Sequence, residues 1–306
     1  MRSAGEHVSR YRCPMTATTE SNPRISGSFD PALSASRAKE YLKCPLQYRL
    51  HVVDRIKEPP TRATAAGTLV HSVLEKLFDV AQADRNEDTA MGLFDQEWAA
   101  TRESLDDVVA MFDDEAALDQ WINETRDVVR GYFTLENPQR LEPVAREKRV
   151  DAYTHDGVRL RGFIDRIDRN PAGELRVVDY KTGKAPSPRF QDEALFQMRF
   201  YALLLKLTDR MPLRTQLVYI KAGQTLTFDP TADDIERFED EVSGIWDRIE
   251  RDAKRGEFAP RHNPLCNWCG VRAHCPLFDG VLPDAPADGI QRLLQTRVPA
   301  SMQEPT

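Results

Sequence analysis

Three cysteines occur within ten residues near the C-terminal end of the chain, in the spacing C-x2-C-x5-C, and they constrain the fold more than any other feature. They are Cys266, Cys269 and Cys275. Three thiolates this close together indicate a metal site, but a structural zinc or an iron–sulfur cluster takes four protein ligands. Cys44, far upstream, is the natural fourth ligand. A fold that forms this site must therefore bring residue 44 to the end of the chain.

The number of thiolates leaves the metal open, because such ligands bind Zn²⁺ and iron–sulfur clusters alike. His262 and His274 lie close to the run and would complete a zinc site without Cys44. Cys13 is a fifth cysteine, in an N-terminal stretch where Met15 offers a plausible alternative start. An odd number of cysteines, in a chain without an apolar signal-peptide core, favours metal binding over disulfides. We therefore expect a cytoplasmic protein.

The chain carries 49 acidic and 42 basic side chains, and its net charge of −7 argues against binding nucleic acid by bulk electrostatics. The acidic excess is concentrated between residues 84 and 119, so a local basic groove elsewhere is compatible with the composition. No window approaches the roughly 20 apolar residues of a membrane span, and no membrane partner is expected. The hydrophobic fraction of 41% is enough to fill a substantial core.

The sequence divides into a polar, disordered segment at 1–30, one folded domain at 31–282 and a flexible tail at 283–306. Apolar residues recur at helical spacing in five segments: 34–56, which Pro45 interrupts, 65–81, a helical insertion at 84–137, 192–207 and 231–256. Strands are predicted as a three-stranded meander at 144–154, 158–170 and 174–183, and as a pair at 214–221 and 224–229. The cysteine run, at 261–279, closes the domain onto Cys44.

Two acids and a lysine lie on adjacent strands of the predicted meander. Asp179 and Lys181, in the stretch VVDYKTGK, are two residues apart and therefore point to the same face of their strand. Asp165, in RGFID on the preceding strand, is brought near Asp179 by the hairpin. Neighbouring carboxylates repel each other unless a cation lies between them, and their oxygens suit Mg²⁺ or Mn²⁺. Taken singly, each acid would more often form a salt bridge.

The whole pattern, G-F-I-D followed by an apolar pair and D-x-K, resembles the signature of the PD-(D/E)XK nucleases, and the RecB-type branch in particular. Two further motifs of that branch match in order. G-x-x-x-H is found at Gly67 to His71, and Q-x-x-x-Y at Gln197 to Tyr201. The matches extend over residues 34 to 278. The resemblance implies an α/β, restriction-endonuclease-like core: a central mixed sheet flanked by helices, with a helical insertion and a C-terminal cysteine staple.

The resemblance also implies roles for the residues that match the motifs. The ligands of Mg²⁺ or Mn²⁺ would be His71, Asp165, Asp179 and the backbone carbonyl of Tyr180. The catalytic set would be Asp165, Asp179, Lys181, Gln197 and Tyr201. Lys181 would orient or activate the attacking water, while Gln197 and Tyr201 would support the site and the nucleic-acid backbone. Glu147, on the strand before RGFID, corresponds loosely to an acid of the family and is kept as an auxiliary residue.

A similar arrangement of one upstream and three downstream cysteines is found in AddB-like nucleases, where it binds a [4Fe-4S] cluster. The resemblance therefore implies a [4Fe-4S] cluster bound by Cys44, Cys266, Cys269 and Cys275, with Zn²⁺ as the alternative. We call these four residues the cysteine staple. Closing so long a loop would stabilise the folded chain by about 5 kcal/mol in the loop-entropy description of cross-links.

The function that these resemblances imply is a metal-dependent deoxyribonuclease, an exonuclease acting on single strands or DNA ends in repair or recombination. Basic residues expected along the phosphate track are Arg37, Lys39, Lys43, Arg49, Arg161, Lys184 and Arg189. The alternative function is a non-catalytic iron–sulfur subunit that binds DNA or acts as a scaffold in a helicase or repair complex. The chain has no ATP-binding loop of the G-x-x-x-x-G-K-[ST] type, so a helicase partner would act in trans.

Overall fold

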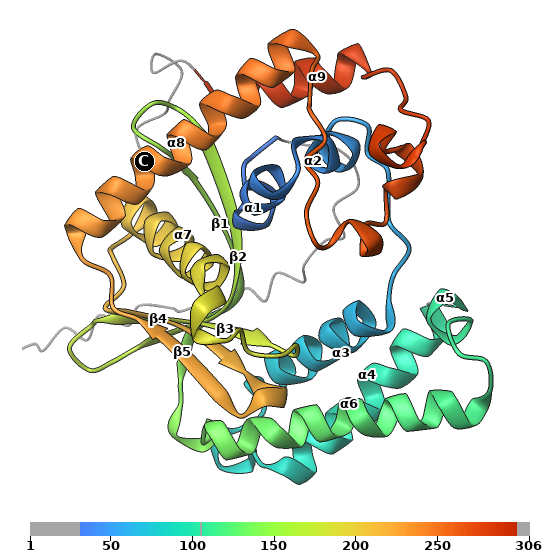
Figure 1. Ribbon diagram of the computed structural model, residues 1–306. Coiled ribbons are helices and arrows are strands. Elements are labelled where there is room, and N and C mark those ends of the chain that lie inside the picture. Colours follow the sequence, from blue (N-terminus) through green and yellow to red (C-terminus); the bar gives the residue numbers. More distant parts are fainter. Residues whose placement is uncertain (1–30, 105, 299–306) are drawn as a thin grey trace, which may run out of the picture. The chain divides into compact units, whose positions relative to one another are not determined.

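A five-stranded mixed sheet forms the centre of the computed structural model, which describes residues 31–104 and 106–298 (Figure 1). The strands lie in the order of the sequence: β1 (Pro143–Tyr153), β2 (Arg159–Arg169), β3 (Leu175–Lys181), β4 (Arg214–Tyr219) and β5 (Gln224–Phe228). Only β3 and β4 are parallel, and α7 (Asp192–Thr208) connects them. The other neighbours are antiparallel. The predicted α/β fold with a central mixed sheet is thereby confirmed.

The meander of β1, β2 and β3 depends on two tight turns that the sequence marks with glycine. Gly157 and Gly173 have φ angles of 87° and 84°, a region that residues with a Cβ atom rarely enter. The register then places Arg166 opposite Val178, so that Asp165 lies at the end of the β2–β3 pairing, next to the last residues of β3.

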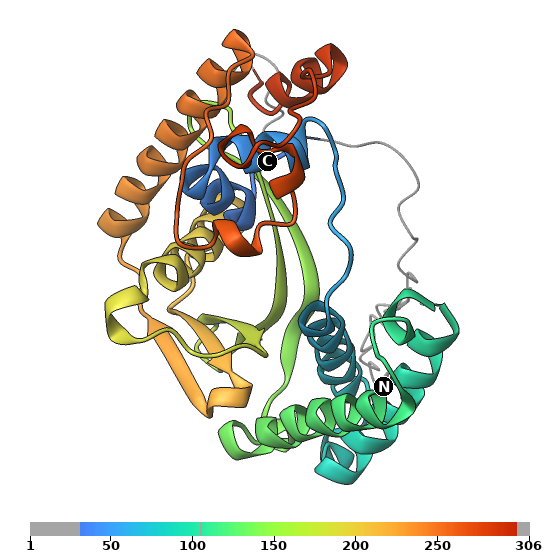
Figure 2. The same cartoon turned by 45° about the vertical axis from the view of Figure 1, so that its right-hand side comes forward.

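Helices that precede β1 and helices that follow β3 pack together on one side of the sheet (Figures 1 and 2). They are α1 (Ala35–Lys43), α2 (Pro45–Val52), α7, α8 (Ala232–Arg255) and α9 (Ala287–Leu294). Tyr41, Phe200 and Trp246 pack there with Leu160 and Ile164 of β2 in the main core. Ser34 caps α1, and the sequence break at residue 45 separates α1 from α2 because proline cannot donate the backbone hydrogen bond that continues a helix.

A second core forms on the other side of β3 and β4. The helices are α3 (Arg62–Leu77), α4 (Glu87–Ser104), α5 (Asp106–Val109) and α6 (Glu115–Leu135), and the last three occupy the segment expected as a helical insertion. Val178, Tyr180 and Val218 pack against them. Short 3₁₀ turns are found at Gln82–Asp84, Pro138–Arg140, Pro188–Phe190, Ile220–Ala222, Cys266–Trp268, Arg272–His274 and Pro276–Phe278. Among the described residues, no helix is long and apolar enough to cross a membrane.

The sequence predicted a flexible tail from residue 283. This prediction is wrong for residues 283–298, the part of the tail that the structure describes. Leu293 of α9 is buried in the main core, and Val158 forms a β-bridge with Arg297. The Arg297 guanidinium lies 2.8 Å from both Asp156 and Asp247. The mostly polar sequence of this segment gave no sign of the packing. One turn of apolar residues and one arginine are enough to anchor it. The predicted disordered segment at 1–30 lies outside the described residues, as do 299–306.

A buried arginine joins the insertion to the sheet. Arg166 of β2 is 1% exposed, and its two terminal nitrogens each lie 2.7 Å from an oxygen of Glu136, the residue that ends α6. It also contacts Asp168 and donates a hydrogen bond to the Tyr180 hydroxyl. Each guanidinium hydrogen points in one fixed direction. The buried bidentate pair therefore fixes the position of β2 relative to the end of α6.

Removing this arginine is expected to lower stability strongly. Arg166→Met would leave Glu136 and Asp168 without their buried partner, and such losses cost about 3–5 kcal/mol of unfolding free energy. Urea unfolding followed by circular dichroism measures the change. Arg130→Met, which removes a partly exposed arginine of α6 next to Asp127, is the control and should cause only a small change. Equal stability of the two variants would show that the buried network contributes little.

Candidate active site and cysteine staple

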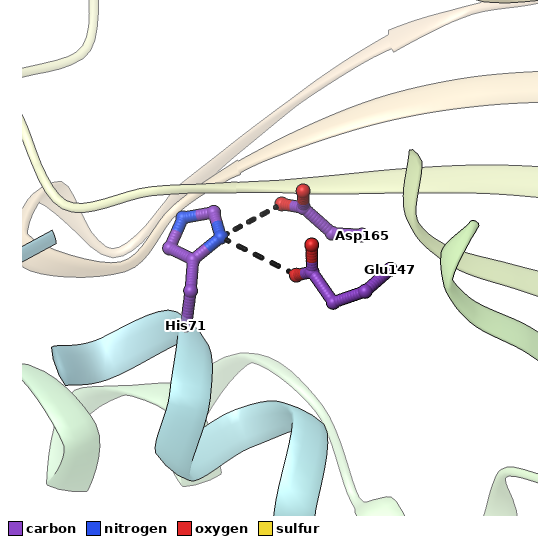
Figure 3. Close-up of side chains that lie close together, drawn as sticks. All are labelled: His71, Glu147 and Asp165. Carbon is purple, nitrogen blue, oxygen red and sulfur yellow. Dashed lines mark ion pairs between the residues drawn. The ribbon is translucent and has the colours of Figure 1, made fainter. Parts of the chain in front are cut away.

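Three side chains from three elements converge at the end of β3 (Figure 3). His71 comes from α3, Glu147 from β1 and Asp165 from β2. His71 Nδ1 lies 3.3 Å from Asp165 Oδ2 and 3.9 Å from Glu147 Oε1. One ligand atom from each of the three residues can be chosen so that all lie within 4.8 Å of one another. This spacing is the one expected of side chains that share a single cation.

The main chain of Tyr180 completes this cluster. Its carbonyl oxygen accepts a hydrogen bond from His71 Nε2 at 3.0 Å, and its N–H donates to Asp165 Oδ2 at 2.7 Å. The Tyr180 ring points to the opposite face and is buried in the second core, as strand alternation predicted. The carbonyl is therefore held beside the acidic group by a rigid, packed residue.

Glu147, which the sequence suggested only as an auxiliary residue, belongs to this cluster. The pairs Arg146↔Arg166 and Lys148↔Ile164 flank it, so Glu147 lies opposite Asp165. Its φ angle is 41°, in the left-handed region, inside a strand. Such a conformation costs a non-glycine residue about 1–3 kcal/mol and is found mostly at functional sites. Counting from the hairpin turn would have placed the two acids opposite each other, but the backbone conformation has no signature in the sequence.

Asp179 is held separately, by residues of α7 and by Lys181. Its Oδ1 accepts hydrogen bonds from Tyr201 OH at 2.7 Å and Gln197 Nε2 at 3.0 Å, and Lys181 Nζ lies 2.7 Å from Oδ2. Gln197 also donates to the Tyr201 hydroxyl at 2.9 Å. Asp179 is 3% exposed and lies outside the 4.8 Å group of His71, Glu147 and Asp165. Gln197 and Tyr201, the residues of the Q-x-x-x-Y motif, thus hold the carboxylate of Asp179, the acid of the D-x-K motif.

The electrostatics of the cluster indicate a place for a cation. Burial and the nearby charge of Asp179 raise the pKa of Asp165 to about 7. Burial lowers the pKa of His71, but the hydrogen bond to Glu147 and the charges of Asp165 and Asp179 outweigh it and raise the value to about 9. Carboxylate oxygens, one imidazole and a backbone carbonyl form a donor set that fits Mg²⁺ or Mn²⁺.

Comparison with known proteins identifies the family of the chain. The family model of the PD-(D/E)XK nuclease superfamily matches residues 32–276. The chain belongs to this superfamily. Of the curated relatives, the Gene 69 protein of Mycobacterium phage L5 is 26% identical over 295 residues, which cover 81% of this chain and 97% of the phage protein. The Gene 69 protein of Mycobacterium phage D29 is 26% identical over 280 residues, with the same coverage of both chains.

Among solved structures, a candidate exonuclease from Eubacterium rectale is similar to this nuclease with a TM-score of 0.47. The two chains are 14% identical, and the match covers 78% of this chain and 87% of the other. At this level of similarity, the assignment of site residues in the nuclease depends on its own geometry.

The four cysteines of the staple line one pocket of the nuclease, although Cys44 lies far from the others in the sequence. Cys44 is the residue between α1 and α2, and it accepts a hydrogen bond from the Arg261 N–H at 3.4 Å. Cys266 accepts one from the Asn263 N–H at 3.3 Å. Neither His262 nor His274, the alternative zinc ligands, lines this pocket. Cys44 and the three downstream cysteines therefore lie around the same pocket.

The four thiols share one environment. Burial raises the pKa of the Cys269 thiol, and the charges of Glu58 and Cys44 add to this effect. Four thiolates around one pocket can bind either Zn²⁺ or an iron–sulfur cluster.

The expected phosphate track needs one correction. Arg49 is only 4% exposed, and it pairs with Asp54 at 3.1 Å and donates to the Pro283 carbonyl. It is a structural residue that joins α2 to the C-terminal segment. Lys39 is different, because its half-buried ammonium faces the site. Burial and the charge of Lys181 lower the pKa of Lys39.

The hydrogen bond from Tyr201 is expected to affect turnover by positioning Asp179. Tyr201→Phe removes the hydroxyl at 2.7 Å but keeps the ring in the core. A carboxylate displaced by about 1 Å can cost on the order of 10²-fold in rate. We expect kcat for cleavage of a labelled oligonucleotide to fall about 10- to 100-fold, with KM nearly constant. Tyr153→Phe, at the far end of β1, is the matched control. A change confined to thermal stability would contradict the positioning role.

Proposed function

We propose that this PD-(D/E)XK nuclease is a metal-dependent deoxyribonuclease of the RecB type that cuts DNA from its ends. The observation that carries the proposal is the convergence of His71, Glu147 and Asp165 beside the Tyr180 carbonyl, with Asp179 and Lys181 next to them. An arrangement of this kind has little structural value, because it concentrates acids that repel each other. Its natural use is divalent-metal chemistry on a phosphodiester.

In the proposed mechanism, His71, Glu147, Asp165 and the Tyr180 carbonyl would hold Mg²⁺ or Mn²⁺. Asp179 would face the same ion or a second one after a small rearrangement. When bound, the metal supplies Lewis acidity toward the phosphodiester. Lys181 orients the attacking water and offsets negative charge on the phosphate, because its ammonium is anchored by Asp179. Gln197 and Tyr201 hold the Asp179 carboxylate in place.

The proposal includes a [4Fe-4S] cluster at the cysteine staple. All four thiols line one pocket, and their arrangement of one upstream and three downstream cysteines resembles that of AddB-like nucleases. The role of the cluster would be structural, since it joins the α1–α2 junction to the C-terminal segment at a distance from the acidic site.

Repair or recombination is the proposed setting, with a helicase as a partner in trans, because RecB-type nucleases resemble this chain in their ordered motifs.

The experiment that tests the nuclease activity compares linear and covalently closed circular DNA of the same sequence. Anaerobically purified protein is incubated with each substrate in Mn²⁺, in Mg²⁺ and in EDTA. We expect metal-dependent degradation of the linear DNA. Degradation of circular DNA at an equal rate would contradict cutting from ends, and no degradation by a folded, cluster-loaded protein would contradict a nuclease.

A further inference from the structure

A groove runs between α3 and α6 beside the end of β3, and neither the proposed metal site nor the cysteine staple uses it. The residues that carry the argument are Arg62, Ala63, Gln120, Glu124, Lys184 and Lys221. We call it the α3–α6 groove. We propose that a single strand of DNA is bound in this groove, so that the helical insertion forms one wall of the substrate path. This inference rests on the proposed nuclease function and names the form of its substrate.

The groove is continuous with the proposed active site. Its lining includes Thr182 and Gly183, the two residues that directly follow Lys181. Around Gly183, no atom lies within 4 Å of the position that a Cβ would take, so the chain is open to a ligand there. The helix that provides one wall, α3, also carries His71 three turns from its start. A strand leaving the metal site over residues 182–184 therefore enters the groove directly.

The groove is positively charged, whereas the helical insertion beside it is acidic. Three cations, Arg62, Lys184 and Lys221, line it, against the single carboxylate of Glu124. Among the side chains that the structure describes, those of residues 31–101 and 108–298, none of the three forms an ion pair with a carboxylate. Arg62 is held in place by donating to the Met111 carbonyl and by stacking 4.4 Å from the Phe112 ring centre, neither of which neutralises it. In a chain with net charge −7, cations left unpaired in one groove indicate an anionic ligand.

The room in the groove is limited. α3 and α6 pack directly, because Trp121 of α6 donates to the Arg62 carbonyl at 3.2 Å and is buried in the second core. The groove is therefore a cavity of about 460 Å³, which these two helices line together with residues 182–184 and Lys221. A cavity of this size holds a short stretch of one sugar-phosphate strand and is far smaller than a segment of duplex. The structure therefore favours a single strand with its phosphates near Lys184 and Lys221.

The binding test uses a fluorescein-labelled 20-nucleotide single strand, with EDTA present so that no cleavage occurs. Anisotropy titrations at several salt concentrations compare the intact protein with the double variant Lys184→Gln/Lys221→Gln. Loss of two phosphate contacts should lower the slope of log K against log salt by about 1.4, because each contact contributes roughly 0.7 for single strands. Lys254→Gln, an exposed lysine of α8 paired with Glu250, is the control and should leave the slope unchanged. An unchanged slope in the double variant would overturn the proposal.

A second measurement separates the groove from the active site. Ala63→Trp places a large ring in the groove at an exposed position of the first turn of α3. The rate on the 20-nucleotide strand, divided by the rate on bis(4-nitrophenyl) phosphate in Mn²⁺, should fall at least tenfold. An unchanged ratio would overturn the groove proposal. Absence of hydrolysis of either substrate by the intact protein would instead contradict the nuclease function, while the binding titration would still decide the groove.

Discussion

Replacing Asp179 by asparagine is expected to lower the rate of metal-dependent DNA cleavage by about 10³-fold or more, which corresponds to roughly 4 kcal/mol of transition-state stabilisation. Asparagine has nearly the same shape and still accepts the hydrogen bonds that Tyr201 and Gln197 donate to Oδ1. The substitution therefore removes the negative charge while leaving the packing intact. Single-turnover cleavage of a labelled strand in Mn²⁺ measures the effect.

The loss of this charge has two physical consequences. Lys181 loses the oxygen at 2.7 Å that holds its ammonium next to the site, so its position is no longer defined. The Asp165 carboxyl, whose pKa is raised by burial and by the charge of Asp179, would ionise more readily. We therefore expect a cation still to bind to His71, Glu147 and Asp165 while turnover is lost. Mn²⁺ binding measured by electron paramagnetic resonance should accordingly be weakened much less than the cleavage rate.

Asp229→Asn provides the matched control. Asp229 directly follows β5, an edge strand of the sheet, and its exposed carboxylate pairs with Arg214. It should cleave DNA at the unmodified rate. Cleavage by Asp179→Asn within tenfold of the intact protein, at equal fold and cluster content, would show that the acid of the D-x-K strand is structural. The proposal that Asp179 is a catalytic residue of this chain would then be wrong.

The sequence predicted the parts of the structure that depend on local periodicity. Alternation along residues 177–181 placed Asp179 and Lys181 on one face and Tyr180 on the other, and the structure has this arrangement. Glycines at the two hairpin turns predicted the meander, which fixes Asp165 beside β3. These features follow from two-residue repeats and turn chemistry, so neighbouring residues suffice to specify them.

Other features could not be predicted because they arise from contacts between distant elements. The left-handed conformation of Glu147 leaves no mark in the local sequence. Arg49 has the composition of a surface residue, yet Asp54 and the Pro283 carbonyl make its burial favourable. The α3–α6 groove likewise depends on how the insertion packs against α3, which helical periodicity alone does not determine.

Replacing Cys269 by alanine is expected to abolish the visible absorption of the anaerobically purified protein and to destabilise the whole domain. With the proposed cluster bound, the four cysteines would connect the α1–α2 junction to the C-terminal segment across almost the entire folded chain. In the loop-entropy description, a cross-link over so many residues stabilises the folded state by about 5 kcal/mol, a large share of the stability of an ordinary domain. Thermal unfolding monitored by circular dichroism, with iron and zinc determined on the same samples, measures both effects.

Cys13→Ala is the matched control, since Cys13 lies outside the described residues and is not part of the staple. It should keep full absorption and stability. The apolar residues Leu46, Leu50 and Val271 pack beside the staple in a small cluster, so the proposed iron–sulfur cluster would supply most of the stabilisation at this point of the fold. We therefore expect loss of colour and loss of stability to occur together in Cys269→Ala. A colourless variant with unchanged unfolding temperature would contradict a structural role, and zinc without iron in the intact protein would contradict the cluster.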